Sequence, residues 1–249
     1  MSGWDAETYH RVASPQEEWG LKLLDRLVLT GDETVLDAGC GSGRMTRHIV
    51  ERVPDGRVIG IDASPAMIEK ARAELGDSAE LRVENLLELE LDEQVDAVFS
   101  NAAFHWVSDH DRLFARLHAA LVPGGAIEAQ CGGQGNVAEL ENALLSLEGD
   151  ERFAPYLRTM VRPWNFASVA DTITRLEREG FEAVRCWFEE VDVRPPEPRA
   201  FVTASGLSYH LEHLPDELHE AFLDALLASM PRPLSLHYVR LNISARRRA

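Results

Sequence analysis

Three glycines at alternate positions follow a short apolar segment that contains one acid. The sequence VLDAGCGSG begins at Val35, so the acid is Asp37 and the glycines are Gly39, Gly41 and Gly43. Glycine is needed where the backbone takes a positive φ or approaches a ligand without an intervening Cβ. Because an apolar strand precedes the loop and a helix is expected after it, the pattern predicts a nucleoside-bearing cofactor at the carboxyl end of the strand.

The acid in this loop narrows the choice of cofactor. Asp37 would repel a pyrophosphate, whereas it would attract an ammonium group such as that of the methionine part of S-adenosylmethionine. A second apolar strand ends in Asp62, an expected acceptor for ribose hydroxyls in either cofactor. The dinucleotide fingerprint needs a glycine at position 44, where the chain has Arg44. An S-adenosylmethionine site is therefore favoured over an NAD site.

The region from Val35 to about Ile127 resembles the class I S-adenosylmethionine-dependent methyltransferases. Beyond the glycine loop and Asp62, the resemblance rests on segments starting at Ser64 (SPAMI), Ser100 (SNAAFHWV) and Pro123 (PGG). These segments resemble the trans-aconitate 2-methyltransferase branch more than methyltransferases in general. Further similarity to that branch is found in Trp4-Asp5, Tyr9, Gly206-Leu207 and the segment Leu214-Pro215-Asp216-Glu217-Leu218.

This resemblance implies which residues bind the cofactor. Asp37 would hold its amino-acid end directly or through water, and Asp62 its ribose. Asn85 stands where the family usually has an Asp for the adenine amino group, and its carbonyl can still accept a hydrogen bond. Ala63 and Met67 would pack on the adenine, although Met67 equally suits the core, and Asp37 also suits a helix cap. The full expected set is Asp37, Gly39, Cys40, Gly41, Gly43, Asp62, Ala63, Met67, Asn85, Leu86, Ser100, Asn101 and Ala102.

Residues after the fourth expected strand lie next to the expected point of methyl transfer. His105 has three possible functions there: a general base, a hydrogen-bond donor to a substrate carboxylate, or an ordinary residue at a helix start. Three arginines, Arg11, Arg162 and Arg194, are candidates for a bidentate partner of an anionic substrate. The expected substrate contacts are Tyr9, Gln16, Trp106, Gln130, Trp164 and Tyr209.

Other polar clusters favour no metal or disulfide. Asp109, His110 and Asp111 are adjacent at an expected helix start, where they point in different directions and Asp109 suits the N-cap. His210 and His213 have no evident third ligand. The chain has three cysteines, without a spacing typical of zinc sites or disulfide frameworks.

Composition excludes several classes of function. The chain has 249 residues, with 42 acids against 25 bases and a formal charge of −17. Binding to nucleic acid needs clustered Lys and Arg, so we expect no nucleic-acid partner. No apolar run reaches the length of a membrane span, and the first 30 residues do not resemble a signal peptide. A cytoplasmic monomer or homodimer with a small-molecule substrate is expected.

The order of elements predicts an α/β fold. Alternating strands and helices indicate parallel strands joined by right-handed crossovers. Family resemblance implies a Rossmann-like, doubly wound, seven-stranded sheet whose last strand is antiparallel. Strands are expected at about 34–37, 57–62, 81–84, 95–100, 126–130, 183–188 and 237–245. Helices are expected at about 14–29, 44–53, 65–74, 109–121, 168–179, 198–212 and 216–229, with a helical insertion over 137–165.

The expected domain organisation is one methyltransferase domain over residues 1–249. Its cofactor-binding core spans 33–131, and segments 132–166 and 198–230 form a helical cap over the active site, since insertions after strand ends lie over the binding face.

The expected reaction is methyl transfer from S-adenosylmethionine to a small molecule. The branch resemblance implies a carboxylate oxygen of a small organic acid similar to trans-aconitate, an acceptor that needs no base. Alternatives are an N- or hydroxyl O-methyltransferase of secondary metabolism with His105 as base, an NAD-dependent oxidoreductase, and a cofactor-binding protein without catalysis.

Overall fold

The structure, a computed structural model, describes residues 14–249, with side chains from Glu17 onward except that of Ser205. The chain divides into two compact units. We call residues 15–134, 164–189 and 240–249 the sheet unit, and the described residues 14, 135–163 and 190–239 the helical unit.

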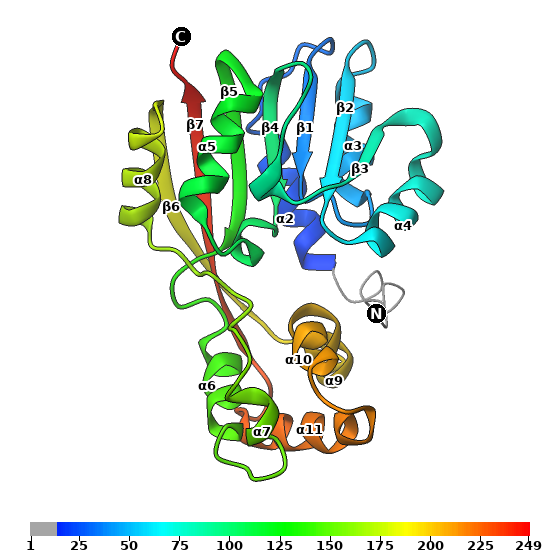
Figure 1. Cartoon of the computed structure of the whole chain (residues 1–249), viewed down its shortest axis with the longest axis vertical. Coiled ribbons are helices and arrows are strands. Elements are labelled where there is room, and N and C mark those ends of the chain that lie inside the picture. The colour runs from blue at the N-terminus through cyan, green and yellow to red at the C-terminus, as the bar shows by residue number, and fades with distance from the viewer. Residues whose placement is uncertain (1–13) are drawn as a thin grey trace. The chain divides into compact units, whose positions relative to one another are not determined.

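A seven-stranded sheet has the order β3-β2-β1-β4-β5-β7-β6 (Figure 1). The pairs β1–β2, β1–β4, β2–β3 and β4–β5 are parallel, whereas β7 runs antiparallel to β5. The predicted fold class, with its antiparallel last strand, is confirmed. The strands are β1 (Thr34–Ala38), β2 (Arg57–Asp62), β3 (Glu80–Val83), β4 (Val95–Asn101), β5 (Leu121–Gly132), β6 (Phe181–Val193) and β7 (Leu236–Arg247).

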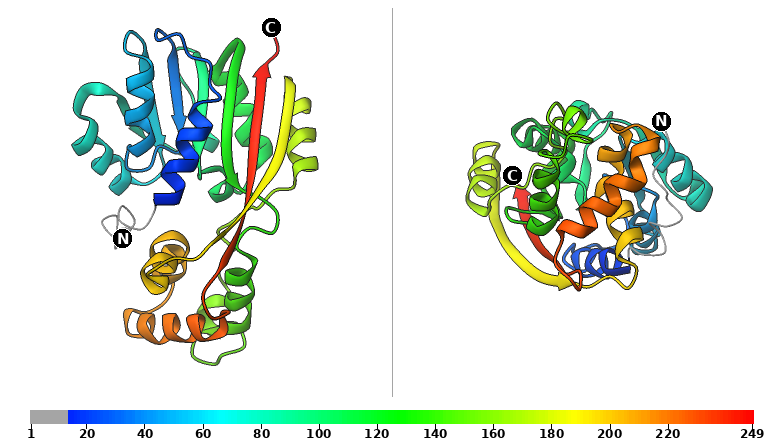
Figure 2. Two further views of the ribbon diagram at one scale, coloured as in Figure 1. Left: turned by 180° about the vertical axis from the view of Figure 1, so that it is seen from behind. Right: turned by 90° about the horizontal axis from the view of Figure 1, so that it is seen from below.

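Helices cover both faces of this sheet because its central strands are apolar on both sides. Val35 of β1 packs in one core cluster with Leu23 and Ile49, while its neighbour Leu36 packs in another with Phe114 and other residues. The first cluster lies under α2 (Ser14–Leu24) and α3 (Arg44–Arg52), and the second under α5 (His110–Ala120) and α8 (Val169–Arg178) (Figures 1 and 2).

Local capping signals set several helix starts in the sheet unit. Ser64 caps α4 (Pro65–Leu75) by accepting from the Met67 amide, with proline in the first turn. Asp109 and Ser168 cap α5 and α8 in the same way. Short 3-10 helices at Gly76–Ser78, Leu86–Glu88 and Phe104–Trp106 complete the unit.

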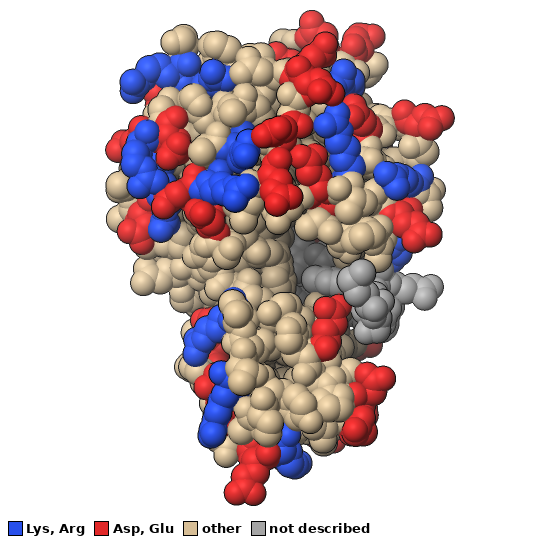
Figure 3. All heavy atoms as spheres, in the orientation of Figure 1, with Lys and Arg blue, Asp and Glu red and all other residues tan. Residues whose placement is uncertain are grey.

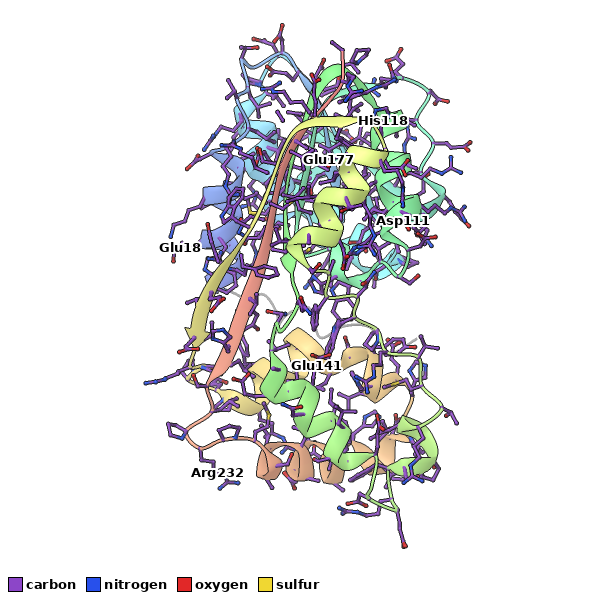
Figure 4. All side chains as sticks on the ribbon, turned by 90° about the vertical axis from the view of Figure 1, so that its left-hand side faces the viewer. Glu18, Asp111, His118, Glu141, Glu177 and Arg232 are labelled. Atoms are coloured by element: carbon purple, nitrogen blue, oxygen red, sulfur yellow. The ribbon has the colours of Figure 1, made fainter. Side chains whose placement is uncertain are left out.

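The helical unit contains α6 (Ala138–Leu147), α7 (Ala154–Leu157), α9 (Pro198–Val202), α10 (Ser208–Glu212) and α11 (Asp216–Ser229). A π-helical segment, Thr203–Leu207, joins α9 to α10. Phe153 and Phe222 meet edge to face inside the unit, with ring centroids 5.5 Å apart. The neighbouring strands β6 and β7 each have residues in both units (Figure 4).

The structure corrects some expected boundaries. Helix α2 ends at Leu24 rather than Leu29, and no helix follows Leu157 in the insertion before α8. The segment expected to be one helix over 198–212 has a π-helical middle. Strands β5, β6 and β7 are longer than expected, because pairing with a neighbouring strand extends an element beyond its own sequence signal; at the two ends of β5, Leu121 pairs with Val95 and Gly132 with Arg240.

The described chain has no helix that combines the length and apolar character of a membrane span. On the face shown in Figure 3, acidic and basic side chains of the sheet unit are interspersed.

Candidate functional site

The glycine loop is tied to the end of β2 by backbone hydrogen bonds. The amides of Gly39 and Cys40 both donate to the carbonyl of Ile61, at 2.8 and 2.9 Å. The amide of Gly41 donates to Asp62 Oδ2 at 3.0 Å. The loop after β1 and the acid after β2 therefore form one structure at the carboxyl edge of the sheet.

Asp62 is a partly exposed carboxylate with both oxygens engaged. Its Oδ1 accepts from the Ser64 amide at 2.8 Å, which complements the bond from Gly41. Burial raises the pKa of Asp62, and the two amide bonds oppose that shift. Each carboxylate oxygen can accept more than one hydrogen bond, so Asp62 keeps the capacity to bind ribose hydroxyls.

Glycine is required at the three positions of the loop for different structural reasons. All have positive φ, at 86° for Gly39, 54° for Gly41 and 83° for Gly43. A Cβ on Gly39 would collide with the Cβ of Ala103, and one on Gly43 would lie 2.9 Å from Leu75 Cδ1. A Cβ on Gly41 would meet no atom within 4 Å. Packing thus explains the outer glycines, and Gly41 alone presents an open side that fits a cofactor.

Asp37 is sealed behind this loop. It is 1% exposed and accepts a hydrogen bond from Thr46 Oγ1 at 2.7 Å. Burial raises the pKa of Asp37 to about 7, a shift that the Thr46 bond opposes and the charge of Asp62 increases. The carboxylate does not cap a helix, and its contact with the ammonium of the cofactor stays a prediction.

The residues expected around the adenine differ in exposure. Asn85 is exposed, and its Oδ1 accepts from the Leu87 amide at 3.0 Å. Leu86 packs in the core and Met67 is 8% exposed, whereas Ala63 is exposed. Cys40, in the loop, is buried. Adenine binding by these residues stays a prediction.

The tip of β4 adjoins the ends of β1 and β5. Ser100 Oγ donates to the carbonyl of Ala38 at 2.6 Å, and the amide of Ala102 donates to the carbonyl of Gln130 at 2.7 Å. Ala102 takes a φ of 59°, a conformation that costs energy for a residue with a Cβ. Asn101 lies between them in the sequence and is half-buried.

His105 accepts a backbone hydrogen bond. The amide of Gly132 donates to His105 Nδ1 at 3.1 Å, so this nitrogen carries no proton and the neutral ring carries its proton on Nε2. Burial, together with the nearby His110, lowers the pKa of His105 to about 3. The imidazole is therefore neutral at physiological pH and offers an N–H donor.

Two aromatic side chains lie against this histidine, and a third contacts both of them. The His105 ring lies 5.4 Å from that of Trp106 and 5.9 Å from that of Phe166, and Trp164 lies 6.0 Å from Trp106 and 5.6 Å from Phe166. The amide of Asn165 donates to the His105 carbonyl at 2.8 Å. This bond holds the segment that contains Trp164 and Phe166 against the segment that contains His105 and Trp106. The structure thus brings together the predicted residues His105, Trp106 and Trp164, and adds Phe166.

The structure also places an arginine at this edge that the sequence interpretation missed. Arg240 donates from Nη1 to Gln130 Oε1 at 3.1 Å and from Nη2 to Glu189 Oε2 at 2.9 Å. Its guanidinium carbon lies 4.3 Å from the ring centroid of Trp19. The available signal was the alternation of polar and apolar residues over 239–246, which predicts one polar face for this strand.

The other expected substrate residues lie outside the described part of the chain or in the helical unit. Tyr9 and Arg11 lie outside the described residues, as does the side chain of Gln16. Arg162, Arg194 and Tyr209 belong to the helical unit. Tyr209 packs there on His213, with ring centroids 4.3 Å apart.

The acid and histidine cluster at the start of α5 has structural functions. Asp109 is the N-cap, and His110 Nε2 lies 2.9 Å from the carbonyl of Phe104. Asp111, labelled in Figure 4, pairs with Arg178 of α8 at 2.6 Å. Within residues 14–249, no group of three or more His, Cys, Asp or Glu side chains is arranged to hold a metal ion.

Comparison with known proteins gives three kinds of similarity. A family described as a methyltransferase domain matches residues 35–125. The trans-aconitate 2-methyltransferase of Methylobacterium radiotolerans is 31% identical over 238 residues, covering 90% of this chain and 88% of that protein. The malonyl-[acyl-carrier protein] O-methyltransferase 1 of Ilyobacter polytropus is 33% identical, covering 60% of this chain and 57% of that protein.

Solved structures share the fold. The phosphoethanolamine N-methyltransferase 2 of Haemonchus contortus, in complex with phosphomonomethylethanolamine and S-adenosylhomocysteine, has a TM-score of 0.60 at 19% identity, covering 93% of this chain and 53% of that one. This likeness, the nearly full-length relative and the acid-glycine loop joined to Asp62 agree with one another. The chain belongs to the class I S-adenosylmethionine-dependent methyltransferases.

Proposed function

We propose that this methyltransferase acts on a carboxylate oxygen of a small organic acid of the trans-aconitate kind. S-adenosylmethionine supplies a methyl group that is already activated by the positive sulfur. The acceptor oxygen forms the new O–C bond with its own lone pair, the methyl–sulfur bond breaks, and its electron pair goes to sulfur. Because a carboxylate is ionised at neutral pH, no proton has to be removed.

The observation that carries this proposal is the hydrogen bond from the Gly132 amide to His105 Nδ1. A histidine held in this tautomer presents Nε2–H, which suits an anionic oxygen. A hydroxyl, or an amine that is protonated at neutral pH, must lose a proton, and a ring whose pKa is lowered to about 3 accepts a proton poorly. The arrangement thus favours a carboxylate over the alternative acceptors.

The cofactor contacts are part of the same proposal. Asp62 binds the ribose hydroxyls, and the open side of Gly41 lets the loop approach the cofactor closely. Ala63, Met67, Asn85 and Leu86 line the adenine end. Two relatives add support for the acceptor, since their names specify trans-aconitate and an O-methyl transfer.

The proposed acceptor is a small molecule and not a polymer, in a cytoplasmic setting. The formal charge of −17 disfavours a phosphate backbone as partner. The interspersed acidic and basic side chains on the face of the sheet unit in Figure 3 also disfavour a phosphate backbone as partner.

A test uses labelled S-adenosylmethionine with trans-aconitate, a phenol and a primary amine. We expect label in the ester of trans-aconitate, and a kcat without a histidine inflection between pH 5 and 8. His105→Asn keeps an acceptor for the Gly132 amide but removes Nε2–H, so kcat/KM should fall about tenfold in a folded protein. Methylation of the phenol or amine, with a pH inflection that His105→Asn abolishes, would establish the base mechanism instead.

His105→Ala is the matched comparison. It removes the same donor and also leaves the Gly132 amide without its acceptor, which costs about 1–3 kcal/mol of stability when the amide is buried. A lower melting temperature in His105→Ala than in His105→Asn would show that the hydrogen bond from the Gly132 amide contributes to stability. A similar kcat/KM in the two variants would show that the loss of activity comes from the missing Nε2–H.

A further inference from the structure

Arg240 occupies a defined position at the carboxyl edge of the sheet. In the β5–β7 ladder it lies opposite Gly132, the last residue of β5 and the hydrogen-bond donor to His105. Its side chain is 14% exposed, packed on Trp19 and bonded to Gln130. Burying a guanidinium is costly unless it is paired, and here its side-chain partners are the Gln130 amide and the partly exposed Glu189 carboxylate.

Contacts connect this arginine with the tip of β4 from two sides. On one side, Gln130 bonds to Arg240 through its side chain and to the Ala102 amide through its carbonyl. On the other side, Trp19 lies under the guanidinium, and a Cβ on the adjacent Gly20 would lie 2.8 Å from Asn101 Nδ2. Arg240 is thus linked to the tip of β4 through Gln130 on one side and through Trp19 and Gly20 on the other.

The surroundings contain a second arginine in an equivalent setting. Arg26 lies 4.8 Å from the ring centroid of Trp187 and donates to Asn242 Oδ1 at 2.6 Å. Gln130 Nε2 donates to the same Asn242 oxygen at 2.7 Å, which links the two arginines. Arg26 bonds to Asn242, which pairs with Gln130 in the ladder, whereas Arg240 itself pairs with Gly132. The contact of Arg26 therefore lies two residues further from the carboxyl edge of β5.

Among the described residues, carboxylates partly balance the charge of the pair. Glu189, 42% exposed, bonds to Arg240, and Glu18 is an exposed neighbour. Glu128 accepts from Ser244, and burial raises its pKa. Burial lowers the pKa of Arg240. The negative charge of Glu189 opposes this shift, and the positive charge of Arg26 increases it. Among the described residues, the buried Nε of Arg240 and Nη1 of Arg26 have no hydrogen-bond partner.

We propose that Arg240, positioned by Gln130 and Trp19, binds a carboxylate of the acceptor that is not the one methylated. This inference rests on the proposed function and names its substrate class: acids with at least two carboxylates. A bidentate guanidinium would withdraw electron density from a reacting oxygen, so its useful partner is the distant carboxylate. His105 Nε2–H, on the other side of Gly132, serves the reacting end.

The test compares trans-aconitate with crotonate, an unsaturated acid with one carboxylate. Calorimetric titration of each acid into the protein saturated with S-adenosylhomocysteine measures binding, and KM and kcat are measured in parallel. For Arg240→Met we expect the Kd and KM for trans-aconitate to rise about 10- to 100-fold with a smaller change in kcat. The values for crotonate should stay within about twofold.

Two further variants control for stability. Arg26→Met removes the equivalent stacked arginine away from the edge, and should leave the preference for trans-aconitate unchanged. Arg240→Lys keeps the charge without the planar fork and should recover part of the affinity. In every variant, binding of S-adenosylhomocysteine should match that of the native protein, which shows that the site is folded.

Several outcomes overturn the proposal. An equal loss for both acids, no loss in Arg240→Met, or an equal loss in Arg26→Met would assign Arg240 to the structure alone. If the native protein binds S-adenosylhomocysteine but methylates no carboxylate, the proposed function fails. The anion site is then judged by binding alone: loss of trans-aconitate binding in Arg240→Met supports it, and no binding by the native protein refutes it.

Discussion

Two carboxylates at the ends of neighbouring strands have different environments. Asp37 is 1% exposed with one hydroxyl donor, whereas Asp62 is partly exposed and accepts from two amides. Burial dominates the raised pKa of both groups. The accessible acid suits ligand binding, and the sealed acid makes the stability of the loop depend on pH.

Asp37→Asn tests this dependence. The pKa of Asp37 is raised from 3.8 to about 7, so its stabilising contribution is complete below about pH 4 and is lost as pH rises through 7. The unfolding free energy of the native protein minus that of Asp37→Asn should therefore fall between pH 4 and 8, by at most about 4 kcal/mol. Urea unfolding at several pH values measures it.

Thr46→Val serves as the second arm of that experiment. It removes the hydrogen bond that favours the ionised form, so the decline should extend to higher pH. A difference between native protein and Asp37→Asn that does not vary with pH would show that Asp37 titrates normally.

At the scale of elements, the direction of β7 decides what reaches the active edge. Because β7 is antiparallel to β5, its first residues lie at the carboxyl end of β5, where Arg240 faces Gly132. A parallel strand would bring its last residues there instead. The loop after β1 depends on a similar long-range contact, the close approach of Gly39 to Ala103.

Substitutions in this loop should separate folding from binding. Gly39→Ala combines a collision with Ala103 and a φ of 86°, so we expect a loss of about 2–5 kcal/mol in stability. Gly41→Ala, with φ 54° and no close atom, should cost about 1–2 kcal/mol yet weaken S-adenosylhomocysteine binding at least about tenfold. Thermal unfolding and calorimetric titration test both. Unchanged affinity in Gly41→Ala would place the cofactor elsewhere.

At the scale of the molecule, the chain forms two compact units that share strands β6 and β7. We propose that segments 132–166 and 198–230 act as a cap over the active site of a single methyltransferase domain. The π-helical segment Thr203–Leu207, which ends two residues before Tyr209, is a feature often found at functional sites.

Hydrogen exchange tests the cap. S-adenosylhomocysteine alone should protect amides of the glycine loop and of residues 62–64 and 100–106. Addition of trans-aconitate should further protect residues 203–212 of the helical unit, because a cap that contacts substrate loses local opening motions. Added protection confined to the sheet unit would contradict the cap and leave the cofactor site intact.

The sequence by itself determined the order of strands and helices, the acid-glycine loop, the position of Asp62 and the family. These features depend on hydrophobic periodicity, glycine conformation and capping, which act over a few neighbouring residues. Boundaries such as the end of α2 and the lengths of β5 to β7 were less predictable, since tertiary pairing extends or shortens an element.

Only the tertiary structure decided the tautomer of His105 and identified Arg240 as the buried cation near it. The amide that sets the tautomer of His105 is 27 residues away, and Arg240 is 110 residues from Gln130. Arg162 and Arg194, equally plausible by residue type, belong to the other unit. Such assignments depend on which strands pair and in which direction, and residue type and spacing do not encode that locally.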